Sequence, residues 1–322
     1  MKSFAFVFPG QGSQSVGMLG GWADHAAVRE TLAEASLALG EDVGQLIEHG
    51  PSDALALTTN TQPVMLVAGV AAFRVWMAET GVAPTVLAGH SLGEYSALVA
   101  AGVLTLTEAA PLVRFRAQAM QDAVPVGVGA MAAILGLDAA KVVEGCAEAA
   151  RSFGPNTLEV VEAVNFNDPL QTVIAGTRAA VDKACEVLKA NGARRALPLP
   201  VSAPFHSTLM KPAAEALREK LAATHFSSPT LSVVNNIDVA VESDVDRIRA
   251  ALYHQAFAPV RWVESIRSIK ARGVDIVVEC GPGKILAGMV KRIDVDMKGL
   301  PLFDSVTLEE VKKVVLNERN EI

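Results

Sequence analysis

The segment that most constrains the fold of this chain is GHSLG at positions 89–93, which follows the apolar run 85–88. Such a run predicts a buried strand, and the residues after Gly93 favour a helix. A serine on so sharp a turn needs small residues two places before and after it, and Gly89 and Gly93 satisfy that need. The pattern therefore predicts a nucleophile elbow with Ser91 at its tip. The alternative is a glycine-lined turn that carries an inert serine.

A nucleophile elbow also predicts which groups lie around the serine and stabilise the reaction. The turn lifts the serine hydroxyl above the sheet and points the N-terminus of the next helix at the reacting centre. Acyl transfer at Ser91 would form a tetrahedral oxyanion, which needs two hydrogen-bond donors. We expect the first donor to be the backbone N–H of Leu92, the residue after the nucleophile.

A glycine-rich loop, FPGQGSQ at positions 8–14, follows the first apolar run. Glycine lets backbone N–H groups approach an anion closely. Gly10 and Gly12 fit the start of the dinucleotide fingerprint, but Ser15 stands where its third glycine should be. The Walker pattern also fails, because no Gly-Lys-Ser/Thr follows. The loop alone leaves two interpretations open: a tight turn without a ligand, or a cradle for an anion.

Composition narrows the class of protein. The chain has 322 residues, of which 51% are hydrophobic and 20% charged, so it can bury a large globular core. It carries 28 basic and 35 acidic side chains, a formal net charge of −7. This balance argues weakly against nucleic acid as a partner. An acidic protein partner would need a local basic patch on this surface.

The cysteines and the apolar runs exclude other classes. Cys146, Cys185 and Cys280 lie far apart without Cys-x-x-Cys spacing, so we expect neither a disulfide framework nor a metal site. The longest uncharged apolar run, 124–137, is shorter than the ~18–20 residues that span a membrane. The N-terminal apolar run is too short for a signal peptide. We expect a cytoplasmic monomer that binds no membrane.

Short apolar runs alternate with longer helical segments, which predicts an α/β fold with a hydrolase-like, mainly parallel sheet. The expected strands of this sheet are residues 4–8, 85–88, 231–234 and 276–280. The expected helices are residues 63–79, 107–122, 211–223, 244–256 and 261–271. Pro63 suits the first turn of its helix, and Thr105 with Glu108 has the spacing of a capping box.

The middle of the chain has a different order of elements. We expect strands at 130–134, 158–165, 171–175 and 195–199, helices at 138–152 and 177–190, and a turn at 167–169. This βαββαβ order is typical of a ferredoxin-like unit. We therefore predict a discontinuous large domain, residues 1–126 and 201–322, with a small subdomain, residues 127–200, inserted into it. A cleft is expected between the two.

A serine nucleophile needs a general base, and histidine is the usual one near neutral pH. His206 follows the second boundary of the small subdomain and is expected to face the cleft, so we favour it modestly. His90 directly precedes the nucleophile and is expected to point away from the reacting face. The remaining histidines, His25, His49, His225 and His254, suit surface positions. Candidates for a triad acid are Asp122, Glu162 and Asp168, and none stands out.

Arg116 lies in the middle of an apolar stripe. At about 100° per residue, it shares a face of the expected helix with Leu112 and Met120, while Arg114 and Gln118 fall on the opposite, polar face. An unpaired charge in an apolar environment is costly, so Arg116 needs a partner. That partner is either an internal carboxylate or the carboxylate of a ligand.

Several motifs together resemble the malonyl-CoA:acyl carrier protein transacylase family of fatty acid synthesis. They are FPGQGSQ, GHSLGEYSALVAAG, RFRAQAMQ (114–121), NFNDPLQTVIAG (165–176), VSAPFHSTLM (201–210) and VECGPGKILAG (278–288). They occur in the family's order and extend to about Phe303, and the tail after it carries no informative motif. The family's fold, a hydrolase-like domain with an inserted ferredoxin-like subdomain, agrees with the expectation above.

The resemblance implies roles for further residues. It assigns the second oxyanion donor to the backbone N–H of Gln11 and makes His206 the base. It implies that a neutral group, the main-chain carbonyl of Gln255, orients His206 in place of a carboxylate; the alternative is that Gln255 is simply a buried amide at a helix end. Arg116 is implied to bind the free carboxylate of malonyl, and the bulky Phe205 to disfavour a methyl group at C2.

The remaining implied contacts concern substrate and partner. Asn165 and the side chain of Gln255 are implied to bind substrate. Acyl carrier proteins are acidic, and two basic pairs are implied to lie near the cleft mouth: Arg194 with Arg195, and Lys291 with Arg292.

The resemblance implies a ping-pong reaction without cofactor, in which malonyl passes from coenzyme A to a serine ester and then to the phosphopantetheine thiol of acyl carrier protein. Three alternatives remain: a serine esterase or thioesterase, a malonyl loader of a polyketide pathway, and a carrier-docking module with an inactive site. Arg116 and the lack of an obvious triad acid argue against the esterase.

Overall fold

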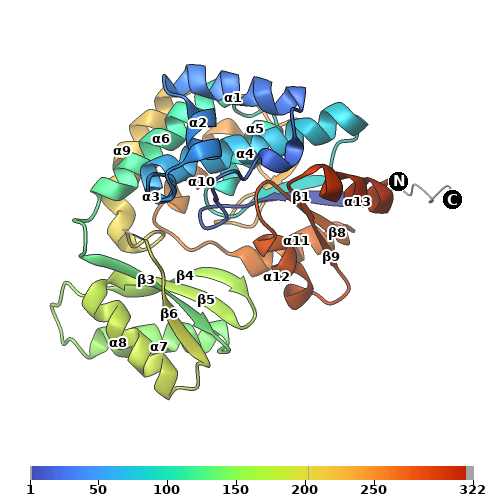
Figure 1. Cartoon of the computed structure of the whole chain (residues 1–322). Coiled ribbons are helices and arrows are strands. Elements are labelled where there is room, and N and C mark those ends of the chain that lie inside the picture. Colours follow the sequence, from blue (N-terminus) through green and yellow to red (C-terminus); the bar gives the residue numbers. More distant parts are fainter. Residues whose placement is uncertain (1, 202, 317–322) are drawn as a thin grey trace.

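The computed structural model describes residues 2–201 and 203–316 (Figure 1). Ser202, which belongs to the motif at 201–210, and residues 317–322 of the C-terminal tail lie outside this description. Two separate sheets form the framework: a parallel sheet of five strands and an antiparallel sheet of four. The expected fold class, an α/β domain with a parallel sheet and a second, ferredoxin-like sheet, is confirmed.

The parallel sheet has the strand order β7-β2-β1-β8-β9. Its strands are β1 (Phe4–Phe8), β2 (Val86–Gly89), β7 (Val233–Val234), β8 (Ile276–Cys280) and β9 (Lys298–Leu302). All neighbouring strands run parallel, with Phe8 level with Gly89 across the central pair. The glycine-rich loop after β1 and the elbow after β2 therefore leave the same edge of the sheet side by side.

Helices cover both faces of this sheet. On one face Phe4, Phe6 and Phe8 pack against α4 (Thr58–Thr80) and neighbouring helices, and on the other Ala5 and Val7 pack against α11 (Trp262–Ala271) and α12 (Ile285–Ile293). The first face also carries α1 (Ala26–Leu39), α2 (Val43–His49), α3 (Ser52–Ala56), α5 (Gly93–Ala100), α6 (Leu106–Asp122), α9 (Lys211–Ala223), α10 (Val245–Gln255) and α13 (Ser305–Val315). Side-chain alternation along β1 thus produces a sandwich of three layers.

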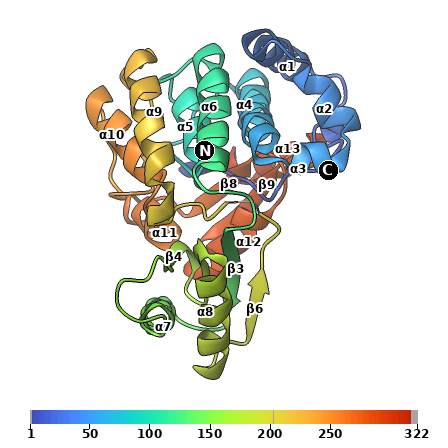
Figure 2. The ribbon, with the colours of Figure 1, turned by 90° about the vertical axis from the view of Figure 1, so that its left-hand side faces the viewer.

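The antiparallel sheet has the order β4-β5-β3-β6 and lies beside the edge of the parallel sheet where the elbow emerges (Figures 1 and 2). Its elements are β3 (Gly129–Leu135), α7 (Ala139–Arg151), β4 (Val161–Asp168), β5 (Gln171–Thr177), α8 (Arg178–Ala190) and β6 (Arg195–Pro198). Ala132, Ile134 and Ala196 face α7 and α8 in a small core of their own. The opposite face, which includes Met131 and Ala133, looks toward the large unit.

Two local expectations are wrong. The helix expected to start at Pro63 begins at Thr58, because Leu57 is extended and Asn60 and Thr61 already donate backbone bonds to its carbonyl. Pro63 therefore lies inside α4. The turn expected at 167–169 is also displaced: Asn167 and Asp168 belong to β4, which bulges twice against β5.

Helix α4 is long and apolar enough to span a membrane by length and composition, and no other helix of residues 2–201 and 203–316 is. However, 78% of its apolar window is buried inside the protein, against α6 and, through Trp76, against Phe4 and Phe6 of β1. It is the central helix of the core.

Candidate active site

The elbow has the strained backbone that its sequence predicts. Ser91 has a φ of 53°, a conformation that side chains other than glycine rarely adopt. A Cβ atom on Gly89 would lie 1.9 Å from the backbone of Gly93, and one on Gly93 would lie 2.1 Å from the carbonyl oxygen of Phe8. Neither position can accept a side chain. The two glycines let β2 turn into α5 close enough to β1 for Ser91 to rise above the sheet edge.

Asn236, which follows β7, holds the elbow from the neighbouring strand. Its Oδ1 accepts a hydrogen bond from the backbone N–H of Ser91 at 2.8 Å, and its Nδ2 donates to the carbonyl of Gly89 at 2.7 Å. Both groups belong to the strained turn, so one buried amide satisfies them together. The sequence analysis missed Asn236. Its position at the carboxyl end of an apolar strand could have identified it, because functional sites of parallel sheets form at that end of the strands.

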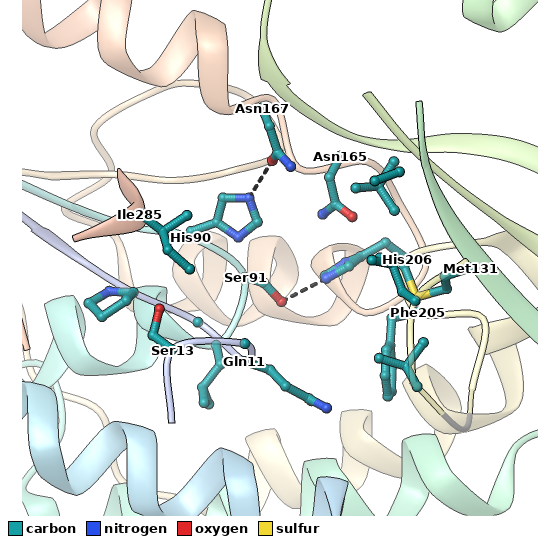
Figure 3. A pocket seen from close by; sticks show the side chains of 18 of the residues that line it. Gln11, Ser13, His90, Ser91, Met131, Asn165, Asn167, Phe205, His206 and Ile285 are labelled. Atoms are coloured by element: carbon teal, nitrogen blue, oxygen red, sulfur yellow. Dashed lines mark hydrogen bonds between the residues drawn. The ribbon is translucent and has the colours of Figure 1, made fainter. Parts of the chain in front are cut away.

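His206 lies opposite Ser91, as Figure 3 shows, with 2.7 Å between its Nε2 and the Ser91 Oγ. Its Nδ1 donates to the main-chain carbonyl of Gln255 at 2.8 Å, which leaves Nε2 unprotonated and able to accept the serine proton. Burial, followed by the nearby charge of Arg116, lowers the pKa of His206 to about 3. The imidazole is therefore a neutral acceptor near pH 7.

The candidate triad acids do not reach His206. Asp168 pairs with Arg292, Glu162 accepts bonds from Thr208, and Asp122 accepts from Gln118. His90 forms a hydrogen bond through Nε2 with Asn167 Oδ1 at 2.8 Å, and its ring packs edge to face on Trp262. His90 also lines the cavity. The imidazole partner of Ser91 is thus His206, oriented by a neutral carbonyl.

The glycine-rich loop packs directly against the elbow. A Cβ on Gly10 would lie 2.6 Å from the carbonyl oxygen of His90, so only glycine permits this approach. Gln11 and Leu92 both line the cavity in front of Ser91, and the Gln11 side chain is turned aside to donate to Thr58 Oγ1 at 3.3 Å. The backbone at Gln11 and Leu92 therefore comes from two adjacent strand ends that meet at the serine.

Arg116 is buried on α6, with 2% of its surface exposed, and its guanidinium reaches the cavity. Nη1 donates to Gln62 Oε1 at 2.6 Å, Nη2 donates to Gln255 Oε1 at 3.0 Å, and Nη2 lies 3.4 Å from Ser91 Oγ. Among the described residues no carboxylate comes within ion-pairing distance of it. Burial lowers the pKa of Arg116 from its usual value, and the group stays cationic at neutral pH.

The sequence analysis also missed Gln62, whose amide oxygen holds Arg116 from α4. Gln62 is an amide in an otherwise apolar stretch of a buried helix, and such a residue needs a polar partner. This need for a polar partner could have identified Gln62 from the sequence.

These groups surround a cavity of about 450 Å³ between the two sheets. Asn165 and Phe205 line it beside His206, and Met131 closes the same side from β3 (Figure 3). Ile285, Leu286 and Met289 of α12 form the other wall. The cavity is mostly apolar, with one guanidinium and one serine–histidine pair at its inner end, so it suits an extended ligand that carries a terminal anion.

The four basic residues expected at the cleft mouth differ in their surroundings. All four are exposed, and the aliphatic part of the Arg194 side chain packs over Gly136. Arg292 donates from Nε to Asp168 Oδ2 at 2.7 Å, and this ion pair joins α12 to β4. Asp168 is almost fully buried, whereas the Arg292 side chain is 53% exposed.

The arrangement can carry out acyl transfer by nucleophilic catalysis. It has a serine on a strained turn, a neutral imidazole within hydrogen-bonding distance, adjacent backbone amides and a buried cation for an anionic acyl group. Within residues 2–201 and 203–316 there is no cluster of three or more histidine, cysteine or acidic side chains that could hold a metal ion.

Comparison with known proteins agrees with this chemistry. The malonyl CoA-acyl carrier protein transacylase of Escherichia coli K12 is 53% identical over 91% of this chain and 93% of its own, and that of Haemophilus influenzae is 48% identical over 98% and 100%. The solved acyl-carrier-protein S-malonyltransferase of Burkholderia pseudomallei 1710b is 62% identical, with a TM-score of 0.93 over 97% of this chain and 100% of that one.

A further solved structure shows a malonyl-transacylase in complex with its type II PKS acyl-carrier protein. It is 46% identical to this chain, with a TM-score of 0.93 over 98% of this chain and all of that one. The family model described as the acyl transferase domain matches residues 5–298. With this match over most of its length, the chain belongs to the acyl transferase family.

Proposed function

We propose that this enzyme transfers malonyl from malonyl-CoA to the phosphopantetheine thiol of acyl carrier protein, through a malonyl ester on Ser91. The names of its relatives support the reaction, and one observation carries the choice of acyl group. Arg116 is a buried cation without a carboxylate partner among the described residues, and its Nη2 lies 3.4 Å from Ser91 Oγ. A malonyl group esterified to that oxygen would bring its free carboxylate to this cation.

In the first half-reaction Ser91 Oγ attacks the thioester carbonyl while His206 Nε2 takes the hydroxyl proton. The oxyanion accepts hydrogen bonds from the backbone N–H groups of Gln11 and Leu92. When the tetrahedral intermediate collapses, the C–S bond breaks and His206 returns the proton to the coenzyme A sulfur. Malonyl remains on Ser91 as an ester.

The second half-reaction reverses these steps with the carrier thiol. His206 removes the thiol proton, the thiolate attacks the ester carbonyl, and the proton passes to Ser91 Oγ as the ester bond breaks. The Gln255 carbonyl holds the Nδ1 proton throughout. A carbonyl stabilises imidazolium less than a carboxylate would, which is tolerable because thiols are good leaving groups.

The side chains around Ser91 select the substrate. Arg116 binds the malonyl carboxylate, with Gln255 holding the guanidinium beside it. Asn165 is close enough to the cavity's inner end to contact the thioester, and Phe205 limits the space for a substituent at C2. We propose no cofactor, since coenzyme A enters as the substrate thioester.

The remaining assignments concern partner and setting. The carrier is proposed to dock at the cavity mouth through two exposed basic pairs, Arg194 with Arg195 and Lys291 with Arg292. We propose that the enzyme works in the cytoplasm as a monomer, in fatty acid synthesis, without binding membrane or nucleic acid. The large and small domains are proposed to be residues 1–126 with 201–322, and residues 127–200.

The central test is the covalent intermediate. After mixing with malonyl-CoA, mass spectrometry of the protein should show one malonyl adduct, and peptide mapping should place it on Ser91. Ser91→Ala should abolish the adduct, because Ser91 Oγ is the one hydroxyl among the described residues that bonds His206 Nε2. Ser13→Ala is the matched control, since Ser13 lines the same cavity and should leave the adduct intact. A persistent adduct in Ser91→Ala would refute the mechanism.

A further inference from the structure

A buried carboxyl lies behind the elbow and takes no part in the steps above. Glu94 is the second residue of α5, with 2% of its surface exposed. Its Oε2 accepts hydrogen bonds from the backbone N–H of Asn236 at 2.9 Å and from Gln255 Nε2 at 3.0 Å. No cation of the described chain lies within ion-pairing distance, and burial raises the pKa of Glu94 to about 7. Both hydrogen bonds use Oε2, so a proton on Oε1 leaves them unchanged.

The contacts of Gln255 fix the orientation of its side-chain amide. Nε2 lies 2.9 Å from the carbonyl oxygen of Ser91, 3.0 Å from Glu94 Oε2 and 3.5 Å from Asn236 Oδ1. All three are acceptors, so an amide turned by 180° would place its oxygen against three oxygens. The orientation with Nε2 toward Glu94 is therefore the stable one, and it leaves Oε1 facing Arg116.

The orientation of the Gln255 amide determines which of its atoms contacts Arg116. With Oε1 toward it, Gln255 accepts a hydrogen bond from Nη2 at 3.0 Å, opposite the bond from Nη1 to Gln62. The guanidinium is thus held on two sides by amide oxygens, and its Nη2 lies 3.4 Å from Ser91 Oγ, the atom that would carry the acyl group. A turned amide would instead place N–H donors against the guanidinium and push it from this position.

We propose that Glu94 is a positioning residue for acyl-group selection: by accepting from Gln255 Nε2, it keeps Gln255 Oε1 on Arg116 and so keeps Arg116 aimed at the substrate carboxylate. This inference rests on the proposed function, because it concerns the same cation. Glu94 itself contacts neither the substrate nor the reacting atoms. Its effect should appear in binding of malonyl and should be absent with an acyl group that has no carboxylate.

A merely structural role must be distinguished from this one. Glu94 lies in the first turn of α5, where a negative charge favours the helix, and it supports the Asn236 backbone. Loss of these contacts would lower stability and slow malonyl and acetyl transfer alike. The discriminating readout is the malonyl-to-acetyl ratio of kcat/KM for acylation of the enzyme.

The experiment compares Glu94→Met, which has a similar shape but no acceptor, with Glu94→Gln, whose amide oxygen can accept the same two bonds. We expect Glu94→Met to lower the ratio about tenfold, mainly through a higher KM for malonyl-CoA, and Glu94→Gln to restore most of it. In a Gln255→Leu background, which keeps the carbonyl for His206, Glu94→Met should lower the ratio no further. If Glu94→Met does not fold, Glu94→Asp, whose shorter side chain cannot reach Gln255, should show the same fall.

An unchanged ratio in Glu94→Met or Glu94→Asp would overturn the inference, and so would an equal fall in Glu94→Gln. Failure of the proposed function looks different, because the unmodified enzyme would then form no malonyl adduct. An enzyme that is malonylated normally but whose ratio ignores Glu94 refutes this inference alone.

Discussion

The guanidinium of Arg116 is the group whose surroundings are hardest to explain without a ligand. Burying a charge costs free energy unless a partner compensates it, and the amide oxygens of Gln62 and Gln255 carry only partial charge. The aromatic face of Tyr95, 5.5 Å from the guanidinium carbon, adds a weak attraction. Glu94 acts on this charge only from behind Gln255, so an anion in direct contact with the guanidinium would have to enter through the cavity at Ser91.

Replacing Arg116 should therefore change the choice of acyl group. Arg116→Ala should lower malonyl transfer by roughly 2–5 kcal/mol, the usual cost of truncating one partner of a buried charge pair. Acetyl transfer should fall little, because acetyl has no carboxylate. Arg116→Lys should restore malonyl transfer only in part, since a point charge lacks the bidentate fork. The measurement is the malonyl-to-acetyl ratio of kcat/KM in the folded variants.

The matched control is Arg114→Ala on the same helix. Arg114 lies on the opposite face, half-buried, where it bonds Asn60 and pairs with Glu41. Its loss should leave the ratio unchanged. If Arg116→Ala also leaves the ratio unchanged, Arg116 is structural and the choice of malonyl loses its physical support.

Among individual residues, the sequence predicted those that a short stretch of neighbouring residues marks as functional. Ser91 could be identified from its flanking glycines, and Arg116 from its place in an apolar stripe. His206 was only modestly favoured, because the contact that orients it joins residues 49 positions apart. The partner atom there is a backbone carbonyl, which every residue carries, so no side-chain pattern marks it. Asn236 and Glu94 act through contacts between residues still further apart in sequence, 145 and 161 positions.

At the scale of elements, α12 depends on a carboxyl beneath its first turn. Glu279 of β8 is fully buried, and its Oε2 accepts the backbone N–H of Ala287 at 2.8 Å, while Oε1 has no hydrogen-bond partner in the described structure. Burial raises the pKa of Glu279 to about 7, against the opposing effect of the helix N–H groups. The residues that it supports, Ile285 to Met289, form one wall of the cavity.

This raised pKa predicts a pH dependence of stability. Between about pH 4.5 and 7 the folded protein holds a proton on Glu279 that the unfolded chain has released, so the free energy of unfolding falls as the pH rises through this window. Glu279→Gln does not titrate. Relative to the unmodified protein, its free energy of unfolding should therefore rise by up to about 3 kcal/mol between pH 4.5 and 8.

Urea unfolding at several pH values checks this difference. Glu264→Gln is the control of opposite sign, because Arg261 holds the pKa of Glu264 below its usual value. Its difference from the unmodified protein should not rise over the same window. A constant difference for Glu279→Gln would mean that Glu279 is ionised throughout.

Elements with a continuous apolar run were the easiest to predict. Strands β1 and β8 have the expected bounds, because parallel strands covered on both faces are apolar along their length. The capping box of α6 is also confirmed. In contrast, β9 was missed: it pairs only with β8, is half-exposed and contains Pro301, which an edge strand tolerates.

At the scale of the whole molecule, a few contacts fix the small sheet against the large unit. The backbone N–H of Phe166 donates to the carbonyl of Val260, and the N–H of Val260 donates to that of Val164. The bond between His90 and Asn167 and the ion pair between Asp168 and Arg292 lie beside them. The βαββαβ order predicted this sheet. Its position could not be predicted, because each contact joins residues about 80 or more positions apart in sequence.

The ion pair of Arg292 also changes the expectation for carrier docking. Because Arg292 already pairs with the buried Asp168, reversing its charge would place two carboxylates together and disturb the wall of the cavity. Arg195 on β6 and Lys291 on α12 make no ion pair within the described residues, and each belongs to an element close in sequence to a cavity-lining residue, Leu199 and Met289. Arg195 lies level with Leu135 across β3, on the sheet face that carries Met131 and Ala133.

Reversing both of these exposed charges tests the docking surface. In a protein of net charge −7, an acidic carrier approaches against overall repulsion unless a local basic patch attracts it. Arg195→Glu with Lys291→Glu should raise the KM for the carrier about fivefold to tenfold and weaken its salt dependence, as exposed pairs contribute up to about 1 kcal/mol each. Exchange of malonyl with free coenzyme A should change much less.

Lys313→Glu, on α13 and far from the small sheet in Figure 1, is the control and should leave carrier kinetics unchanged. If the double reversal has no larger effect than Lys313→Glu, the carrier docks elsewhere, even though the chemistry at Ser91 would stand.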